Sequence, residues 1–577
     1  MTPDFEENQS GFSGILMWIF AGIALFMFLG LHGLWGSESR WAETAREMAV
    51  TGDLLHPALN WEIFRFQPLL TYWLAVPFIQ VMGAEELAVR LPGVLMALAG
   101  LGGTYALARK VFDRQTALLS SWLLLSTYGF LFWGRSVSGE ISGMAWAVLA
   151  AAWFFYAEEK SAWVRIPVFY LILCAGISAK GIQLAAVPIL FILPHIVIGK
   201  KWRSCLHPVQ LPSLTACILL ALLPFYLAEI FPPHRSLISG EMQNLSFREF
   251  LNFENLCRIF TFRSSGSVFL SCLVNLPRLL LPWTPFFVLS IGVAVVNRKT
   301  LGSRFTAFLL GILLLAVYFT VKPPLRWYCI LPMVPFCCVF TAAVLCSGEK
   351  HRSILWVTCF MRWVVILAAS LALASPIMLP VFQMMFKQLP PVMVVLALPL
   401  AGLIALAVCI MDNEPGNKIE HLCGIPYQLV STVVGAAILS ATVFGVIRPG
   451  MTVYRTGRPF IKSLAPLLAG VPGKNIAFYE TDAVADFQFY LEWNEPVTLL
   501  KRGEVKSFLR RLSGKKAAFF CYGTSDVLET LVPELTSAGV DPAALKPVRR
   551  EPGEGKKWVL FLFEPPSAQT ETKAGGK

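Results

Sequence analysis

Charged residues are scarce in this sequence of 577 residues. Asp, Glu, Lys and Arg together make up 15% of the chain, whereas soluble domains contain roughly 25%. Hydrophobic residues make up 56%, and the segments 391–411 and 425–447 contain no charged residue. Each of these segments is long enough to cross a bilayer as a helix. The composition therefore excludes an ordinary soluble protein and predicts a polytopic α-helical membrane protein.

Ionisable residues are rare inside the apolar segments, and the sequence shows no internal repeat. Arg90, Glu229 and Arg362 are the main charges there, and each lies within a turn or two of a predicted span end. Transporters often carry repeats, and ion-coupled ones more often place charges near the middle of the membrane. The pattern favours an enzyme that acts at the membrane surface, with a lipid or sugar transporter as an alternative.

Metal-ligand spacing and a cleavable leader are also lacking. The 13 cysteines lie mostly in apolar segments, which is typical of small buried side chains. The residues predict no particular cofactor and no protein metal site, and they leave a divalent cation open. The acidic N-terminus has no basic segment or small-residue cleavage site, so we expect 12–31 to be a retained first span.

The apolar segments predict thirteen membrane spans. Their approximate bounds are 13–31, 87–108, 116–133, 141–157, 165–178, 183–198, 212–230, 279–296, 304–321, 328–346, 354–382, 390–411 and 426–447. The shorter segment 68–82 is predicted to lie at the membrane interface or to re-enter the membrane.

Basic residues recur in alternate loops between these spans. The loops contain Arg109/Lys110/Arg114, Lys160/Arg165, Lys200/Lys201/Arg203, Arg298/Lys299/Arg304 and Lys350/Arg352. Cytoplasmic loops of membrane proteins collect Lys and Arg, so we expect a cytoplasmic N-terminus and, after thirteen crossings, an outer C-terminus. The net charge of +12 therefore needs no nucleic-acid partner to explain it.

The chain is predicted to divide into three parts. Residues 1–447 form the transmembrane part, with large outer loops at 32–86 and 231–278. Residues 448–565 alternate short β-type runs with helical patterns, which predicts a small α/β domain on the outer side. Residues 566–577 are predicted to be a disordered tail.

The predicted topology places four polar clusters on the outer face. They are the loops 32–67, 134–140, 179–181 and 322–326, which together contain two notable carboxylates, Glu38 and Glu140, and a basic residue in each loop. Any one basic side chain could extend to lipid headgroups, and Glu38 with Arg40 could form the solvated face of an interfacial helix. The coincidence of acids and bases favours a shared site instead.

Such a set of residues suits sugar transfer from a phosphate carrier. A carboxylate can act as general base toward an acceptor hydroxyl or phosphate. Cationic side chains can stabilise the departing phosphate. A lipid carrier would explain a site at the membrane surface.

The same segments resemble a known family. They read ESRWAETAREMAVTGD at 38–53, PLLTYWL at 68–74, GRSVSGE at 134–140, SAKG at 178–181, LPWT at 281–284 and RWYCILPMVP at 326–335. The sequence resembles the C-type membrane glycosyltransferases related to protein O-mannosyltransferases, and most of all the lipid A aminoarabinose transferases. The resemblance runs from the first span to about residue 340 and implies about thirteen spans with an outer C-terminal α/β domain.

The resemblance also implies roles for individual residues. Glu140 occupies the position of one loop acid of the family, and Glu38, one residue after the position of the other, is expected to take its role. Tyr328 lies near a lid residue. The residues that would bind the donor phosphate are Arg40, Arg65, Gln67, Arg135, Lys180, Lys322 and Arg326. Two positions depart from the family pattern, because Ser37 replaces an Asp and Gln67 replaces a Lys.

The sequence therefore predicts a glycosyltransferase in the bacterial inner membrane. Its donor would be a polyprenyl-phosphate sugar, its acceptor a lipid or other envelope molecule, and its site would face the periplasm. Membrane lipids are expected partners, and nucleic acid is not. A non-catalytic relative that binds a lipid-linked sugar is a second alternative, because two family residues are replaced.

Overall fold

The computed structural model describes fourteen stretches of the chain. They are residues 3–63, 68–233, 274–321, 327–347, 352–380, 392–410, 421–422, 425–449, 457–481, 484–512, 517–523, 525–537, 549–550 and 557–563. Within them, nine helices are long and apolar enough to cross a membrane, or eleven if each of two bent helix pairs is one span. The prediction of a polytopic helical membrane protein is confirmed, and the number thirteen stays a prediction.

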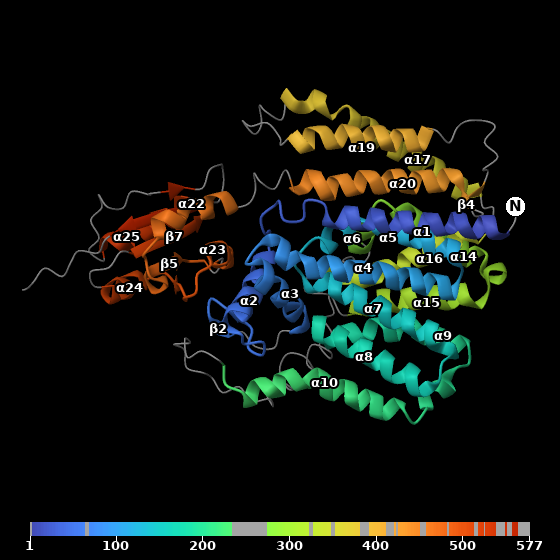
Figure 1. Ribbon diagram of the computed structural model, residues 1–577, viewed down its shortest axis with the longest axis horizontal. Coiled ribbons are helices and arrows are strands. Elements are labelled where there is room, and N and C mark those ends of the chain that lie inside the picture. The colour runs from blue at the N-terminus through green and yellow to red at the C-terminus, as the bar shows by residue number, and fades with distance from the viewer. Residues whose placement is uncertain are drawn as a thin grey trace, which may run out of the picture.

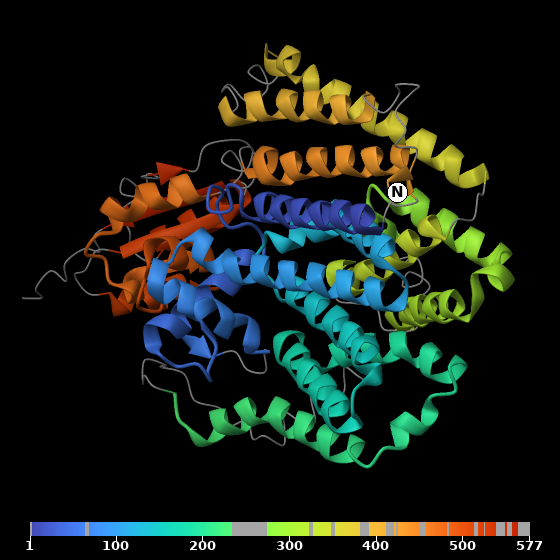
Figure 2. The ribbon, with the colours of Figure 1, turned by 45° about the vertical axis from the view of Figure 1, so that its right-hand side comes forward.

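The first half of the chain forms most of the packed bundle (Figure 1). Its long helices are α1 (Pro3–Phe26), α4 (Glu86–Val111), α5 (Arg114–Leu125), α6 (Tyr128–Gly134), α7 (Gly139–Tyr156), α8 (Ala162–Lys180), α9 (Ala186–Ile198) and α10 (Gln210–Ile230). Helix α10 lies along one edge of the bundle in both ribbon views (Figures 1 and 2). Only 6% of its most apolar 18-residue stretch is buried inside the protein, as expected for a helix that faces lipid on most sides.

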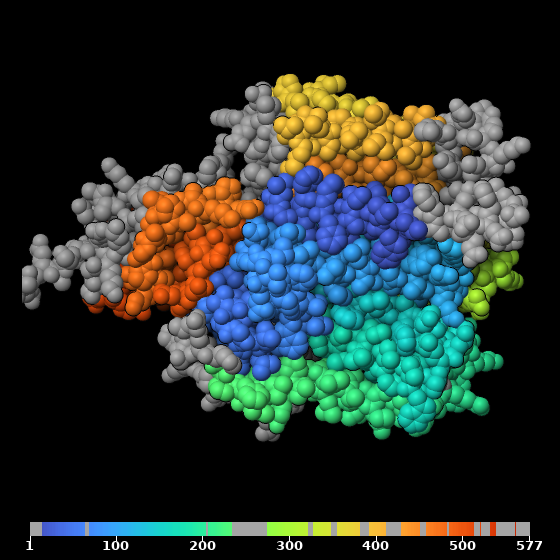
Figure 3. Space-filling view, viewed as in Figure 1, coloured from blue at the N-terminus to red at the C-terminus, as the bar shows by residue number. Residues whose placement is uncertain are grey.

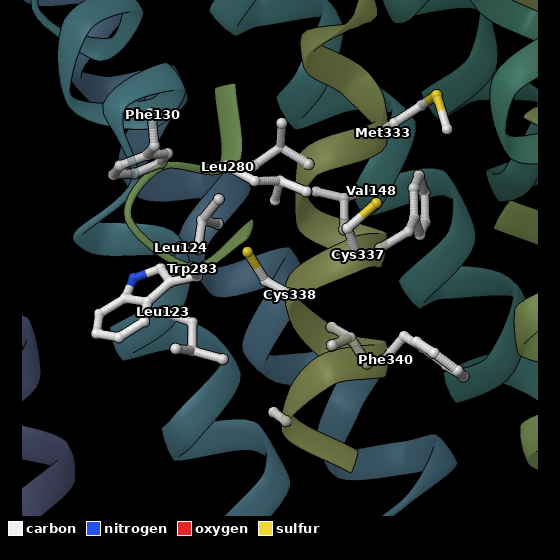
Figure 4. Close-up of a cluster of buried hydrophobic side chains, with 14 of the residues drawn as sticks. Leu123, Leu124, Phe130, Val148, Leu280, Trp283, Met333, Cys337, Cys338 and Phe340 are labelled. Atoms are coloured by element: carbon white, nitrogen blue, oxygen red, sulfur yellow. The ribbon is translucent and has the colours of Figure 1, made fainter. Parts of the chain in front are cut away.

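The second half adds the helices α14 (Thr284–Val296), α15 (Arg298–Val321), α16 (Val334–Cys346), α17 (Arg352–Leu373), α19 (Val392–Ile410) and α20 (Tyr427–Thr442). Of these, α17, α19 and α20 lie along the edge opposite α10 (Figures 1 and 2). Short helical turns occur along the whole chain at η1 (Ala157–Glu159), η2 (Ile182–Ala185), η3 (Trp202–Leu206), η4 (Trp327–Met333), η5 (Ser375–Met378), η7 (Val443–Ile447) and η8 (Gly473–Asn475). The span formed by η4 and α16 is 89% buried. Figure 4 shows part of the surrounding core, with Leu123, Leu124 and Trp283 beside Cys338 of α16.

The segment predicted as one span over 116–133 is divided into α5 and α6, which meet at 65°. Thr127 has an extended backbone, and its hydroxyl accepts the Phe130 N–H as the N-cap of α6. The Trp283 indole N–H donates to Ser126 Oγ at 2.8 Å and stabilises the break. The bend therefore has a local cause, because side-chain hydroxyls satisfy backbone groups that a continuous helix would pair.

Between α1 and α4, the chain forms a small helical layer at one end of the bundle. It consists of α2 (Glu38–Thr51), the hairpin strands β1 (Ala58–Leu59) and β2 (Glu62–Ile63), and α3 (Leu70–Met82). Helices α2 and α3 share a hydrophobic core, and Trp41 stacks on Tyr72 with ring centroids 4.8 Å apart. Helix α3 covers the predicted interfacial segment 68–82 and is shorter than a span.

The described part of 457–563, here called the C-terminal unit, lies beside α2 at the same end of the bundle (Figures 1 and 3). Its elements are α22 (Arg458–Leu468), β5 (Ile476–Tyr479), α23 (Ala485–Leu491), β6 (Thr498–Leu500), α24 (Val505–Arg511), β7 (Ala517–Gly523), α25 (Ser525–Ser537), β8 (Arg549–Arg550) and β9 (Lys557–Phe563). The sheet order is β6-β5-β7-β9-β8, with β5 parallel to β6 and β7, and β9 antiparallel to β7 and β8. Two further strands, β3 (His421–Leu422) and β4 (Ile425–Pro426), pair with each other.

Candidate functional site

Glu38 is the first residue of α2 and is 4% exposed. Its carboxylate forms a bidentate ion pair with Arg90 of α4, with Arg90 Nη2 2.8 Å from Oε2 and Arg90 Nε 3.2 Å from Oε1. The backbone N–H groups of Val137 and Trp35 also donate to it, at 2.9 and 3.0 Å. Glu38 therefore joins α2, α4 and the loop before α7.

These contacts keep Glu38 ionised. Burial raises the pKa of this carboxyl, but the charge and hydrogen bonds of Arg90 and the Val137 N–H outweigh burial, so its pKa lies below the usual value. Both carboxylate oxygens already accept hydrogen bonds, and Glu38 is in a helix. A one-residue offset on a helix turns a side chain by about 100°. The catalytic role expected of Glu38 stays a prediction.

Arginines cap the C-terminal end of α1. Arg135, which is fully buried, donates from Nη1 to Ala24 O and Leu25 O at 2.7 and 2.9 Å. Arg90 donates to the carbonyls of Leu29, His32 and Gly33 in the following turn. The last carbonyls of a helix have no partner inside the helix and carry partial negative charge, so guanidinium groups stabilise them. These arginines thus fix the chain that leads into α2.

Glu140 lies in the first turn of α7, where the positive end of the helix dipole favours a carboxylate. Lys180, the last residue of α8, donates a hydrogen bond from Nζ to Glu140 Oε1. The other oxygen, Oε2, is buried and has no hydrogen-bond partner among the described residues. A buried acceptor without a partner is costly, so it marks a place where a substrate proton donor could bind.

Three further groups surround this ion pair. A Cβ added at Gly139 would lie 3.2 Å from the Trp41 ring, so the α2 indole packs directly on the start of α7. Thr71 Oγ1 donates to Ala179 O at 3.0 Å and ties α3 to the end of α8. Cys329 Sγ lies 3.8 Å from Glu140 Oε1 and brings η4 to the same place.

The structure thus brings together residues from three predicted polar loops, 32–67, 134–140 and 179–181. Of the fourth, Lys322 and Arg326 lie outside the described residues, as do Arg65 and Gln67. Tyr328, the predicted lid residue, packs on Trp133 with ring centroids 4.2 Å apart. Arg40 is exposed on α2.

Sequence reasoning did not identify Arg90 or Cys329 as part of this arrangement. The signal for Arg90 was its charge in an otherwise apolar segment, because a buried arginine near a span end needs an anionic partner. Nothing in the sequence singled out Cys329 among the 13 cysteines. Among the described residues, no group of three or more His, Cys, Asp or Glu side chains could hold a metal ion.

The chain is similar to known proteins in parts of its sequence and in its fold. Residues 66–227 match the family model described as dolichyl-phosphate-mannose-protein mannosyltransferase. An uncharacterised protein of Aquifex aeolicus is 26% identical over 359 residues, which cover 61% of this chain and 67% of that protein. The undecaprenyl phosphate-alpha-4-amino-4-deoxy-L-arabinose arabinosyl transferase of Pseudomonas aeruginosa is 28% identical over 220 residues, which cover 37% of this chain and 40% of that enzyme.

The fold is similar over nearly the whole chain to the crystal structure of ArnT from Cupriavidus metallidurans bound to undecaprenyl phosphate. The TM-score is 0.68 with 17% sequence identity, and the match covers 95% of this chain and 97% of that one. The fold is therefore that of the C-type membrane glycosyltransferases. In sequence, the chain is similar to the protein O-mannosyltransferase family model over residues 66–227 and to lipid A aminoarabinose transferases over 220 residues.

Proposed function

We propose that this protein transfers a sugar from a polyprenyl-phosphate donor to a lipid or other envelope acceptor, with Glu140 as the general base. The observation that carries the proposal is the buried Lys180–Glu140 pair, whose Oε2 has no partner among the described residues. The site lies at the end of the bundle that holds the C-terminal unit (Figure 1). We assign this end to the periplasmic side of the bacterial inner membrane, because the basic loops predict the opposite end to be cytoplasmic.

In the proposed reaction, an acceptor oxygen attacks the anomeric carbon of the donor sugar. The bond from that carbon to the phosphate oxygen breaks, and its electron pair leaves with the polyprenyl phosphate. Glu140 Oε2 takes the proton of the acceptor hydroxyl. Lys180 holds Oε1 and so fixes the direction in which Oε2 points. No metal or redox partner is required to balance these steps.

Cationic residues would stabilise the charge that develops on the leaving phosphate. Arg40 is exposed on α2, whose Trp41 contacts Gly139 beside Glu140, and is our first candidate for this role. Arg65, Gln67, Lys322 and Arg326 remain predicted contacts of the donor, and Tyr328 remains a predicted lid residue. Arg135 enters the proposal as a structural residue instead, because it is buried and bonded to α1 carbonyls.

We assign Glu38 a positioning role. It touches Val137, three residues before Glu140, and both of its oxygens are occupied by Arg90 and backbone N–H groups. A single free carboxylate is sufficient for general-base catalysis. Glu140 can therefore serve without a second acid at Ser37.

The donor class is supported by the relatives named above, because undecaprenyl phosphate is part of the donor of the arabinosyl transferases and is the lipid bound to ArnT. The test is a transfer assay with the purified protein in lipid nanodiscs, a radiolabelled polyprenyl-phosphate sugar and an envelope lipid extract. Transfer of label to an acceptor supports the proposal. Binding of the donor without transfer would favour a non-catalytic binding protein, and movement of intact donor across sealed vesicles would favour a transporter.

Cys329 offers a readout of donor binding that does not depend on turnover. Its thiol is partly exposed and lies 3.8 Å from Glu140 Oε1. Polyprenyl phosphate should slow alkylation of Cys329 by a thiol reagent, and Cys329→Ala identifies the labelled position by mass spectrometry. Equal labelling with and without saturating lipid would place the donor elsewhere.

A further inference from the structure

Helix α2 is packed between the proposed site and the C-terminal unit. On one side, Glu38 accepts the Val137 N–H at 2.9 Å and Trp41 packs on Gly139. On the other side, α23 and the segment 493–497 contact α2 and its flanking loops (Figure 1). The C-terminal unit therefore touches the proposed site through α2, and this raises the question of what it contributes.

Arg46 makes the central contact between α2 and the C-terminal unit. It is 2% exposed, and its guanidinium donates to both oxygens of Glu43 at 2.7 Å. Two further N–H groups donate to Trp493 O at 2.6 Å and Asn494 Oδ1 at 3.1 Å. A guanidinium that pairs its charge on one element and donates to a second holds the two elements in one fixed geometry.

Asn60 makes a second contact, in the turn between β1 and β2. Its backbone has a positive φ of 58°, a conformation that Asn tolerates better than most residues. Its side chain pairs with the backbone of Val497, because Nδ2 donates to Val497 O at 3.0 Å and Oδ1 accepts the Val497 N–H at 2.9 Å. Gln488 Nε2 donates to the same Oδ1 at 2.8 Å.

Helix α23 completes the attachment near the start of α2. The Leu34 N–H donates to the Tyr490 hydroxyl at 2.6 Å. Phe489 is fully buried in the hydrophobic core shared by α2 and α3, although it belongs to the C-terminal unit. The contacts thus lie before, within and after α2, and they combine apolar burial with buried polar groups whose partners are specific.

We propose that the C-terminal unit acts as a clamp that positions α2 against the N-terminal end of α7, with Arg46 and Asn60 as its positioning residues. The inference rests on the proposed function for its effect on catalysis. None of the clamp contacts reaches Glu140 directly. The clamp acts through the Glu38–Val137 hydrogen bond and the Trp41–Gly139 contact, which fix the segment that carries Glu140.

The test compares Asn60→Ala with Glu534→Gln as a matched control. Asn60→Ala removes three hydrogen bonds between the two parts of the protein. Glu534→Gln weakens contacts inside the C-terminal unit, where this carboxylate accepts from the Tyr479 hydroxyl and the Gly503 N–H, without touching α2. Gln488→Ala serves as a milder second variant, because it leaves the Asn60–Val497 pairing intact.

The first readout is amide hydrogen exchange in nanodiscs, which needs no substrate. The clamp predicts that Asn60→Ala speeds exchange in α2 and at Val137 by roughly tenfold, because local opening becomes easier. Glu534→Gln should leave both regions unchanged, and Gln488→Ala should fall between the two. Unchanged exchange at Val137 in Asn60→Ala, or equal acceleration in Glu534→Gln, would overturn the proposal.

The second readout is the rate of sugar transfer. It applies only if the parent protein transfers sugar. Misplacing catalytic groups reduces turnover more than binding, so Asn60→Ala should lower kcat by roughly tenfold or more while KM for the donor changes little. Glu534→Gln should keep the parent kcat. Absence of transfer in the parent would count against the proposed function, whereas the exchange measurement still decides whether the clamp exists.

Discussion

Lys180 donates a hydrogen bond to one oxygen of Glu140, while the second oxygen is buried with no hydrogen-bond partner among the described residues. The two residues are 40 positions apart, at the C-terminal end of α8 and the N-terminal end of α7. Glu140 is 6% exposed at its side chain and Lys180 is 25% exposed. The carboxylate is thus buried, whereas the lysine beside it is partly exposed.

Replacing Lys180 should test whether the pair acts as a unit. Lys180→Met leaves the Glu140 carboxylate buried without its cation, so we expect the free energy of unfolding to fall by roughly 1–3 kcal/mol. This is below the usual cost of breaking a buried pair, because Lys180 is partly exposed. The double variant Glu140→Gln/Lys180→Met should regain most of this stability. It should remain inactive. Thermal unfolding in detergent measures the first effect. Additive losses in the double variant would show that the two side chains are not coupled.

The positioning role of Glu38 predicts a mainly structural effect. Glu38→Gln leaves Arg90, a fully buried guanidinium, without its anionic partner. The free energy of unfolding should therefore fall by about 3 kcal/mol or more. Glu480→Gln is the matched control, because Glu480 pairs with Arg502 and the two side chains are 34% and 63% exposed. The control should cost under about 1 kcal/mol. A Glu38→Gln protein with parental stability and greatly reduced turnover would instead identify Glu38 as a catalytic residue.

The clamp region should respond to pH through Glu47 of α2. Burial and the neighbouring Glu43 raise the pKa of Glu47 well above its usual value, although the Trp61 N–H and Arg46 act in the opposite direction. The folded protein therefore binds more protons than the unfolded chain at pH values between the usual carboxyl pKa and the raised one. Stability must fall as pH rises through that window, by up to about 1.4 kcal/mol per pH unit for one such group.

The variant Glu47→Gln removes this titration. It should be more stable than the parent at a pH above the raised pKa, and its melting temperature should vary less with pH than the parent's once the pH exceeds the usual carboxyl pKa. Glu62→Gln is a suitable control, because Glu62 is an exposed residue of β2. A parent whose stability rises with pH over the same range would contradict the assigned direction.

The sequence was most informative where a single physical constraint dominates. A lipid environment requires apolar residues over the length of a helix, so the spans around α4, α7 and α16 lie close to the predicted segments. Short β-type runs and helical patterns likewise located β5 and α23 in the C-terminal unit. Whether that unit is an independent domain on the outer side stays a prediction.

Contacts between distant segments were harder to predict. The sequence marked Arg90 as an unusual charge but could not show that Glu38, 52 residues away, is its partner. It grouped Arg135 with the phosphate-binding residues, whereas the structure places this side chain against the carbonyls of α1. Both arrangements depend on tertiary packing that brings helix ends together, and no local pattern encodes it. The attachment of Asn60 to Val497 has the same origin.

The most direct test of the account is the turnover of Glu140→Gln measured beside Glu159→Gln. Both carboxylates lie on the continuous span formed by α7 and η1, and each pairs with a lysine. Glu159, in η1, is at the opposite end from Glu140, and its side chain is 84% exposed beside Lys110. With a labelled polyprenyl-phosphate sugar as donor, Glu140→Gln should lose at least about 100-fold in kcat, as expected for loss of a general base, and still bind polyprenyl phosphate. Glu159→Gln should keep the parent rate. A Glu140→Gln protein that transfers sugar at the parent rate would contradict the assignment of Glu140 as the base.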